Sequence, residues 1–596
     1  DTADLAVDMR DDLLASDAKG DHVEPHLVGQ QALWAGMQDL SKEDLAAAET
    51  TGFPIVLLIL LAVFGSLAAA ALPLALGFAS VLVTGAAIFF LSQATDMSVF
   101  VTNVASMIGI GVAVDYSLFI LARYREEIRA GREPAAARRV ALRTSGLAVA
   151  FSGLTVMISL AGLFLVDSTT IRSMAMGAIV VVAVSILGAV TLLPVLMRLL
   201  GRRAYARGRV AIVGALVARN WRNLRRRAGS THPGRPPRRD FWQRWTDQVT
   251  RRPVLAALLS AGVLLVLAIP ALSLKFGDGA LRQFPVHYET RVGAELAAKK
   301  MGPGSQGPVQ AITTNERAVP RYVRELRRDP EVARVAPPRT ARDGGAVLLQ
   351  VTPRHDPESN EARALASRMR GMDGLEVGGA TAYVEDFKDQ VSGSMWKILV
   401  FVLAFSYLVL LVLLRSVLLP LKAVVMNLLS VAAAYGVLVA VFQYGWLDGL
   451  LGYDSLGYVH TMTPPFLLAI VFGLSMDYEV FLLTRIRERY DATGDNTTAV
   501  AQGLKRSAAT ISSAALIMVA VFAVFAGIGV PSVKEIGLGL AVAIALDATL
   551  VRLVLVPATM ELMGRWNWWL PRPLARVLPR RSFEASGSAE SAPAGA

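Results

Sequence analysis

The stretch GVAVDYSLFILARYREE, residues 111–127, places Asp115 inside a long apolar run. Between positions 51 and 122 the only other charged residue is Asp96. A second stretch, GLSMDYEVFLLTRIRER (473–489), places Asp477 in the same setting, and a shift of 362 positions aligns the two with eight identities in sixteen positions. The chain therefore contains an internal duplication, and membrane proteins built from such repeats generally place their functional site between the halves, near the middle of the bilayer.

The composition is typical of a polytopic membrane protein. Of 596 residues, 54% are hydrophobic and 18% charged, and the mean hydropathy is +0.47, whereas a soluble domain carries about a quarter charged residues. Cysteine is absent, which excludes disulfides, thiolate metal sites and cysteine nucleophiles. Eleven apolar runs approach the ~20 residues that a membrane-spanning helix needs, near residues 52–70, 72–92, 100–122, 145–166, 173–198, 253–274, 396–414, 420–443, 462–484, 508–529 and 536–558.

The expected fold class is a polytopic α-helical membrane protein with a pseudo-two-fold repeat and α+β, ferredoxin-like extracytoplasmic domains. The polar segment 275–395 has the β-α-β-β-α-β order of a split βαβ unit. Its expected strands are 309–314, 332–337, 345–353 and 375–383, and its expected helices are 317–328 and 359–371. Residues 1–50 resemble the second half of that unit, with a helix at 3–15, a strand at 22–29 and a helix entering the membrane.

Seven segments follow from this interpretation. They are a remnant of a first extracytoplasmic domain (1–50), a first bundle of five helices (51–200), a basic cytoplasmic connector (201–252), a single membrane helix (253–274), a second extracytoplasmic domain (275–395), a second bundle (396–564) and a largely disordered cytoplasmic tail (565–596). The break between the first two spans is expected at Pro73.

The distribution of arginine predicts the orientation in the plasma membrane. Residues 201–252 carry fifteen Arg against two Asp, and loops rich in Lys and Arg face the cytoplasm. The segments 123–143 and 485–506 are also basic, so 1–50 and 275–395 are expected outside the cytoplasm. Because the chain starts at Asp1 on that side without a preceding span, we expect at least one membrane helix upstream.

The paired Asp-Tyr motifs are the candidate functional site. Residues four apart share a helix face, so Gly111, Asp115 and Phe119 form one stripe, and Gly473, Asp477 and Phe481 form its counterpart. Glycine lets a facing helix approach, and each neighbouring tyrosine, Tyr116 or Tyr478, offers a hydroxyl donor. A carboxylate at the bilayer centre costs at least about 2.5–3.5 kcal/mol, and burial favours its protonation. The pattern predicts a proton relay; its plain alternative is a pair of buried structural hydrogen bonds.

Other polar residues in the spans have less distinctive settings. Ser152 and Ser513, on the helix after each motif, either extend the polar path or simply pack. Asp547 precedes Arg552 by five residues, which favours a structural ion pair. Glu479 has no acidic counterpart in the first repeat, where Ser117 stands, so we do not expect it to be an obligatory proton carrier.

The two Asp-Tyr helices, the split-βαβ segment and the ending DATLVRLVLVPATMELMGRWNWWLP (547–571) resemble the MmpL (mycobacterial membrane protein, large) transporters of the resistance-nodulation-division superfamily. The resemblance covers essentially the whole chain. It implies twelve membrane helices and two porter domains in the intact protein, of which the first helix and the front of the first porter domain are missing here. It further implies proton-driven export of lipids, glycolipids or other hydrophobic molecules, with Asp115, Tyr116, Asp477 and Tyr478 hydrogen-bonded crosswise as the proton site.

Three alternatives stay open at this point. They are a hydrophobic drug efflux pump of the same fold, an intramembrane aspartyl protease and a lipid sensor that does not transport. The protease reading is weakened because VAVD and LSMD replace the expected Gly-x-Gly-Asp run. We expect a non-enzyme.

The expected partners are a hydrophobic or lipid substrate and the membrane itself. The net charge is +12, but the basic residues flank membrane spans, so nucleic acid is not expected. Residues 201–252 either bind anionic lipid headgroups or only carry the usual cytoplasmic charge. No cofactor or metal is expected beyond the proton gradient, and monomer and trimer remain equally open.

Overall fold

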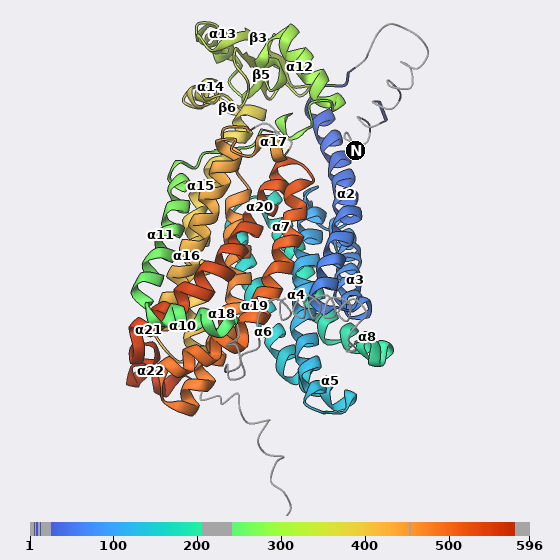
Figure 1. Cartoon of the computed structure of the whole chain (residues 1–596). Coiled ribbons are helices and arrows are strands. Elements are labelled where there is room, and N and C mark those ends of the chain that lie inside the picture. The colour runs from blue at the N-terminus through green and yellow to red at the C-terminus, as the bar shows by residue number, and fades with distance from the viewer. Residues whose placement is uncertain are drawn as a thin grey trace, which may run out of the picture.

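The computed structural model describes residues 26–204, 241–279, 281–451 and 455–578, together with the single positions 5, 8, 9 and 12. Within these residues eleven helices are long and apolar enough to cross a membrane, which confirms the polytopic fold class (Figure 1). Their main segments are α2 (Gln30–Phe64), α3 (Leu67–Ser92), α4 (Val101–Arg129), α6 (Leu147–Ala161), α7 (Thr169–Val190), α11 (Pro253–Ala268), α15 (Ala380–Leu414), α16 (Leu418–Leu438), α18 (Thr463–Thr493), α19 (Asn496–Gly527) and α20 (Pro531–Leu546).

Helices α4 and α18, which carry the Asp-Tyr motifs, lie at the centre of the bundle. In their most apolar windows 94% and 83% of the residues are buried, against 11% for the peripheral α11. Each central helix is therefore surrounded mainly by protein rather than lipid, a setting in which a membrane carboxylate is tolerated.

The two repeats pack against each other through equivalent pairs of helices. Helix α4 of the first repeat packs against α19 of the second, and α18 of the second packs against α6 of the first. Since α19 follows α18 as α6 follows α4, these contacts are equivalent under the repeat. A movement of α4 or α18 therefore affects the helix of the opposite repeat that packs against it.

A small α+β domain, residues 281–379, lies beyond one end of the bundle and is called the head domain here (Figure 1). Its strands β2 (Val309–Thr313), β3 (Val332–Val335), β5 (Val347–Pro353) and β6 (Glu376–Gly379) form an antiparallel sheet in the order β3-β5-β2-β6, with β4 (Arg339–Thr340) also on β5. Helices α13 (Val319–Leu326) and α14 (Asn360–Arg370) connect the strands in the predicted split-βαβ order, and α12 (Glu289–Met301) precedes them.

Alternation along the strands explains the core of the head domain. In β2 and β5 every second side chain is buried, as expected for a sheet with one face covered by helices. Val309, Leu349 and Val351 pack with Leu326 of α13 and Met369 of α14. The sequence pattern was sufficient here because strand periodicity and helix periodicity differ clearly.

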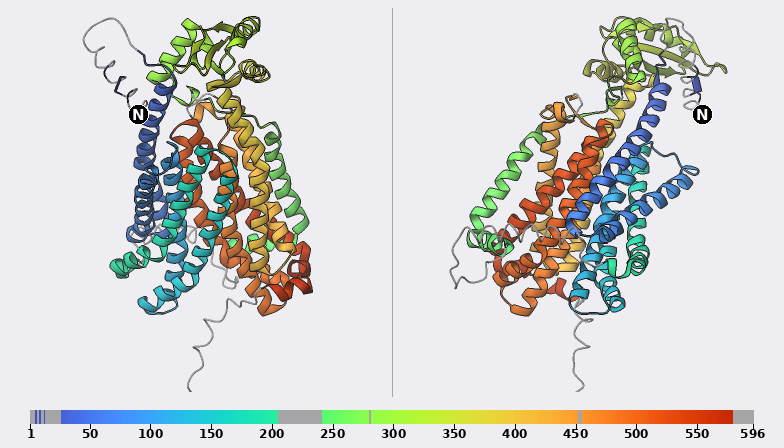
Figure 2. Two further views of the ribbon diagram at one scale, coloured as in Figure 1. Left: turned by 180° about the vertical axis from the view of Figure 1, so that it is seen from behind. Right: turned by 45° about the vertical axis from the view of Figure 1, so that its right-hand side comes forward.

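Two long helices join the bundle to the head domain. Helices α2 and α15 have 35 residues each, about 50 Å at 1.5 Å per residue, so both exceed the ~30 Å hydrocarbon layer. In the views of Figure 2 their outer ends rise to the head domain, where the Tyr288 hydroxyl donates to the carbonyl of Gly36 at 3.3 Å.

Several predicted boundaries are wrong. The first two spans separate at Gly65, which ends α2 in the left-handed conformation (φ 66°), whereas Pro73 lies inside α3. Membrane helices tolerate proline because neighbouring groups satisfy the freed carbonyl. Residues 26–28 are not in a strand, and the last strand of the head domain ends at Gly379, where α15 begins, rather than at Tyr383.

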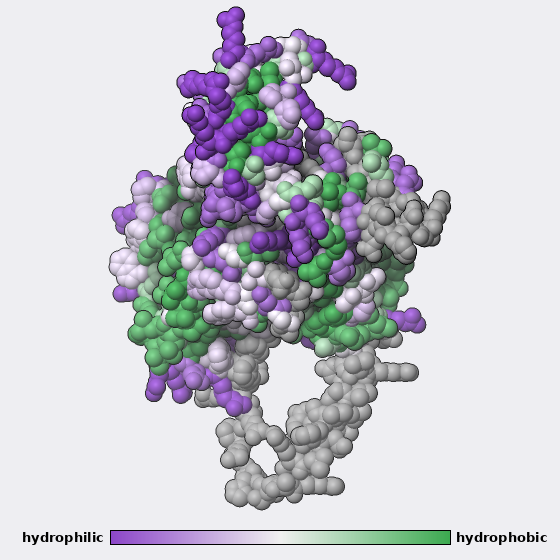
Figure 3. Space-filling view, turned by 90° about the horizontal axis from the view of Figure 1, so that it is seen from above, coloured by the Kyte–Doolittle hydropathy of each residue, from purple (hydrophilic) through white to green (hydrophobic). Residues whose placement is uncertain are grey.

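Apolar side chains are exposed around the bundle, whereas hydrophilic ones cover much of the head domain, as the view from above in Figure 3 shows. Leu58, Phe89, Phe90, Leu258 and Leu265 are all more than half exposed. Exposed apolar surface of this extent marks contact with lipid. Most of residues 1–25, the first half of the predicted remnant 1–50, and most of the basic connector 201–252 lie outside the described residues.

Candidate functional site

The Asp115 carboxylate on α4 accepts a hydrogen bond from the Tyr478 hydroxyl on α18, with 2.6 Å between Oδ1 and Oη. Both side chains are almost fully enclosed, with exposures of 3% and 4%. The bond joins the two repeats directly. Its short length is typical of a hydroxyl donating to a carboxylate.

The second acid has different surroundings. Asp477 is partly exposed, and it accepts a hydrogen bond from the Thr155 hydroxyl of α6 at 3.3 Å. Tyr116, the counterpart of Tyr478, makes no hydrogen bond of ordinary geometry among the described residues, although its hydroxyl lies near Ser152 and Asp477. The crosswise pairing implied by the resemblance is thus present in one direction, from Tyr478 to Asp115.

Glycine and aromatic residues surround the acids as the helical stripes require. The ring of Phe119 lies 5.7 Å from that of Tyr478 and 5.4 Å from that of Phe481, measured between centroids. A side chain at Gly473 would come within 3.0 Å of the Val156 backbone on α6, and one at Gly111 within 3.1 Å of the Phe522 ring on α19. The two glycines therefore allow the close packing of α18 and α4 on the opposite repeat.

Arg552 forms the buried ion pair with Asp547 that the sequence predicts. Both residues lie in a π-helical segment, Asp547–Leu555, whose i→i+5 hydrogen bonding brings residues five apart onto one side. The Arg552 guanidinium also lies 4.7 Å above the Tyr478 ring. Tyr478 is consequently held between a permanent cation on one side and the Asp115 carboxylate at its hydroxyl.

A further charged group borders the site on the other side of α18. Glu479 accepts a hydrogen bond from Asn427 of α16 at 3.2 Å, and Lys422 of α16 interacts electrostatically with the same carboxylate. This pairing could not be predicted from the sequence, because Lys422 and Glu479 lie on different helices and the first repeat has neither residue. Glu479 nevertheless has a buried charged neighbour.

Two further residues beside the acids, Thr155 and Met518, are not among those predicted from the sequence. Thr155 follows Ser152 by three residues, so the helical period alone places both on one face of α6. Met518 of α19 lies 2.8 Å from the Tyr478 hydroxyl, whereas Ser513 on the same helix makes no hydrogen bond to either Asp-Tyr pair among the described residues. In the described ranges no group of three or more His, Cys, Asp or Glu side chains is arranged to hold a metal ion.

Two helical repeats, each with one Asp-Tyr pair on its central helix, together with a split-βαβ head domain, define a membrane protein of the resistance-nodulation-division type. The sequence profile of the MMPL family matches residues 4–256 and 292–589. The chain belongs to this family, as the resemblance of its motifs predicts.

Known relatives agree with this assignment. The heme uptake protein MmpL11 of Mycobacterium tuberculosis is 48% identical over 98% of this chain and 61% of its own length. The mycolic acid-containing lipids exporter MmpL11 of Mycolicibacterium smegmatis is 46% identical over 94% of this chain and 59% of its own length. The chain thus spans about three fifths of the length of these relatives.

A solved structure shows the same fold at low sequence similarity. The hedgehog release protein Disp from the water bear Hypsibius dujardini superimposes with a TM-score of 0.58 at 13% identity, over 88% of this chain and 71% of that one.

Proposed function

We propose that this chain belongs to a transporter that couples proton movement through the Asp115–Tyr478 and Asp477–Tyr116 pairs to the export of a lipid or another hydrophobic molecule. The hydrogen bond from Tyr478 to Asp115 carries the proposal. It joins the two repeats through a titratable group, so that the protonation state of the group bears on how the repeats pack.

The physical basis is a change in the best partner of each acid. An ionised carboxylate accepts hydrogen bonds from Tyr478 or Thr155, whereas a protonated one needs an acceptor for its own hydrogen. Each proton that moves down a 100 mV potential releases about 2.3 kcal/mol. One or two protons are enough to bias a conformational equilibrium of a few kcal/mol.

The proposed cargo rests on the family and on the relative from Mycolicibacterium smegmatis, whose name describes export of mycolic acid-containing lipids. We propose that the head domain receives the lipid from the outer leaflet. Hydrophobic drug efflux is the nearest alternative.

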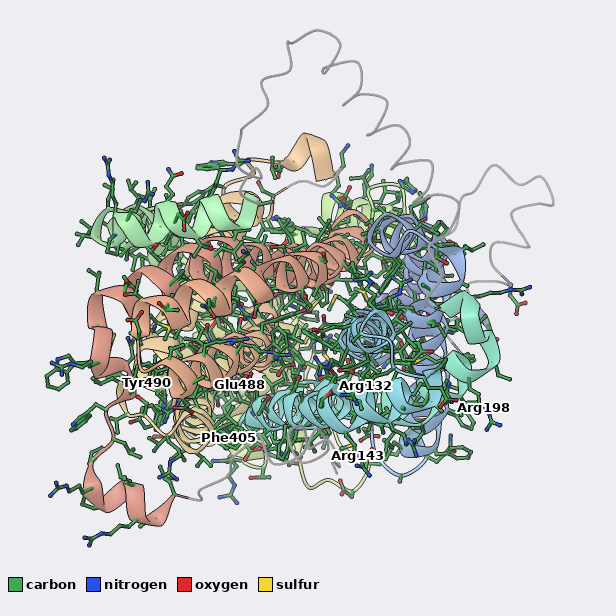
Figure 4. All side chains as sticks on the ribbon, turned by 60° about the horizontal axis from the view of Figure 1, so that its bottom comes forward. Arg132, Arg143, Arg198, Phe405, Glu488 and Tyr490 are labelled. Atoms are coloured by element: carbon green, nitrogen blue, oxygen red, sulfur yellow. The ribbon has the colours of Figure 1, made fainter. Side chains whose placement is uncertain are left out.

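The basic residues support an orientation with the head domain outside the cytoplasm. Figure 4 shows Arg132, Arg143 and Arg198 at the end of the bundle opposite the head domain, where the loops carry arginine. By the Lys/Arg rule this end faces the cytoplasm.

The test is lipid transport by the protein reconstituted in liposomes with an imposed pH gradient. Asp115→Asn and Asp477→Asn keep shape and hydrogen-bonding capacity but cannot ionise, so each should reduce gradient-driven flux at least a hundredfold. Asp96→Asn is the matched control, because Asp96 is exposed in the loop after α3, and its flux should equal that of the unchanged protein. Undiminished flux in either site variant would refute the relay.

The same variants separate the transporter from an intramembrane protease. A protease of this type needs both carboxylates for peptide cleavage, so cleavage of a membrane peptide that disappears in each variant would favour the enzyme. We expect no cleavage by the unchanged protein.

A further inference from the structure

A second buried polar cluster lies where the head domain joins the bundle. The segment 274–279, called the head-domain link here, follows the membrane helix that begins with α11 and contains strand β1 (Phe276–Gly277). Strand β1 pairs in parallel with β7 (Val459–His460), and α18 begins three residues after β7 ends. The start of α20 packs against β7. Three segments that are distant in sequence therefore meet at the head-domain end of the helix that carries Asp477.

Hydrogen bonds connect the three segments through His460. The Gln283 amide nitrogen lies 2.9 Å from Nε2 of His460 and also donates to the carbonyl of Asp278 at 3.0 Å. The Ser532 hydroxyl of α20 donates to Oε1 of Gln283 at 3.1 Å. The cluster thus ties the head-domain link to α20.

Glu535 ties α20 to the first residues of α18. Its carboxylate accepts the His460 backbone N–H at 2.9 Å and the Thr463 hydroxyl at 2.7 Å. Thr463 is the first residue of α18, so Glu535 satisfies donors at the start of that helix, where negative charge is favourable. Asp477 lies fourteen residues further along the same helix.

Asp278 is the least satisfied member of the cluster. Its side chain is 14% exposed and lies 3.6 Å from Nε2 of His460, whose side chain is 5% exposed. Neither carboxylate oxygen makes a hydrogen bond of ordinary geometry among the described residues. A buried carboxylate in this state is costly when ionised, and protonation removes that cost.

The balance of burial and nearby charge also favours the protonated form of Asp278. Burial, followed by the nearby Glu358 carboxylate, raises the pKa of Asp278 to about 7, while the Thr461 hydroxyl and Arg363 oppose the rise. Burial lowers the pKa of His460 to about 4. Near neutral pH Asp278 is therefore partly protonated and lies beside a neutral imidazole. Glu535, Tyr383 and Tyr458 are the other titratable groups whose charge Asp278 influences.

Two glycines fix the position of Asp278. A side chain at Gly277 would come within 2.6 Å of the Tyr458 ring, and Gly279 has a φ of +44° with the Tyr458 hydroxyl in the space of its missing side chain. The link is thus closed around Tyr458, and Asp278 cannot turn away from His460 unless this packing opens.

We propose that Asp278, His460 and Glu535, with Gln283 and Ser532, form a proton-sensitive latch that holds the head-domain link to the start of α18 and α20 and opens when it loses its proton. The inference deepens the proposed function, since it places a second proton-responsive site between the head domain and the helix of Asp477. Protonation from the extracytoplasmic side closes the latch, and release of the proton loosens the start of α18.

The sign of the pH dependence follows from the raised pKa of Asp278. When the latch opens, the carboxyl regains its ordinary value of 3.8, so the closed state binds the proton more tightly and dominates at low pH. The free-energy advantage that the proton gives the closed state falls as the pH rises from about 4 to about 7, and it is fully lost above that range. With one proton involved, opening becomes close to tenfold more favourable per pH unit in the middle of this interval.

The test is hydrogen exchange of the protein in lipid nanodiscs, followed by mass spectrometry of peptides covering residues 456–466. Protection factors, corrected for intrinsic exchange, should fall roughly thirtyfold or more between pH 5 and 7 and change little above pH 7.5. Asp278→Asn cannot ionise, so its protection should stay high and independent of pH. Protection that does not vary with pH in the unchanged protein would overturn the latch, as would an Asp278→Asn variant that follows the unchanged protein.

Two further variants complete the test. Glu358→Gln removes the carboxylate that raises the pKa of Asp278 without touching the latch hydrogen bonds, so the midpoint should move to lower pH; a midpoint that stays or rises would overturn the assignment to Asp278. Asp115→Asn should keep the full pH dependence of the latch. Hydrogen exchange does not depend on transport, so the two proposals fail separately. Protection without pH dependence together with intact gradient-driven flux would refute only the latch. Protection with the expected pH dependence together with flux that Asp115→Asn and Asp477→Asn leave undiminished would refute only the proposed function.

Discussion

At the scale of single residues, the two aspartates differ although their motifs are nearly identical. Asp115 is enclosed and bonded to Tyr478, while Asp477 is partly exposed and bonded to Thr155. The more accessible acid exchanges protons with its surroundings more easily. In the proposed relay we therefore expect Asp477 to take up the proton first and Asp115 to respond second.

The first prediction compares the two tyrosines. Tyr478→Phe removes the hydroxyl that bonds Asp115, a hydrogen bond to a charged group worth about 1.5–3 kcal/mol, and should slow gradient-driven flux about tenfold or more. Tyr116→Phe is the matched change on a hydroxyl without a hydrogen bond of ordinary geometry in the described residues, and should cost clearly less. Flux assays in liposomes measure both, and equal losses would argue against the one-sided pairing.

The second prediction concerns the buried ion pair. Arg552→Leu leaves the Asp547 carboxylate buried without its cation and should destabilise the protein by about 3–5 kcal/mol. The double variant Asp547→Leu/Arg552→Leu removes both charges and should recover much of that loss. Thermal unfolding in detergent micelles, monitored by tryptophan fluorescence, compares the two. If the double variant were less stable than Arg552→Leu, the ion pair would stabilise the protein by more than the mutual neutralisation of two buried charges.

At the scale of helices, glycine decides how closely the two repeats approach. Helix α18 contacts α6 at Gly473, where a methyl group would lie 3.0 Å from the Val156 backbone. A backbone atom cannot yield as a side-chain end can, so the helices must separate if the methyl is added.

The third prediction tests this contact. Gly473→Ala should lower the unfolding temperature by several degrees and reduce flux, because the Asp477–Thr155 bond spans the same pair of helices. Gly85→Ala is the matched control, since its added methyl would meet nothing within 4 Å and alanine favours a helix by about 0.5–1 kcal/mol. Its stability should be equal or higher. A Gly473→Ala protein as stable as the control would show that α18 and α6 can move apart without cost.

Sequence periodicity predicts the elements better than their ends and contacts. The eleven spans, both Asp-Tyr helices and the strand order of the head domain follow from hydropathy, duplication and alternation. The extension of α15 back to Ala380 does not, because the mostly polar run at 385–394 interrupts the apolar pattern before the membrane span begins. The cluster of Lys422 with Glu479, and that of Asp278 with His460, join different elements, so no local pattern signals them.

At the scale of the whole molecule, the basic loops and the head domain lie at opposite ends of the bundle (Figure 1). If the positive-inside rule sets the topology, every loop has a determined side. The α3–α4 loop at Asp96 and the turn at Asp343 in the head domain should be outside, and the α4–α5 turn at Glu133 should be inside.

The final prediction tests this topology with single cysteines, which the absence of natural cysteine makes free of background. Asp343→Cys and Asp96→Cys, both at exposed positions, should react in intact cells with a maleimide that cannot cross the membrane. Glu133→Cys, equally exposed, should react only after the membrane is permeabilised. The reverse pattern would place the head domain in the cytoplasm. The latch would then exchange its proton with the cytoplasm, so it could not respond to the higher proton concentration outside the cell.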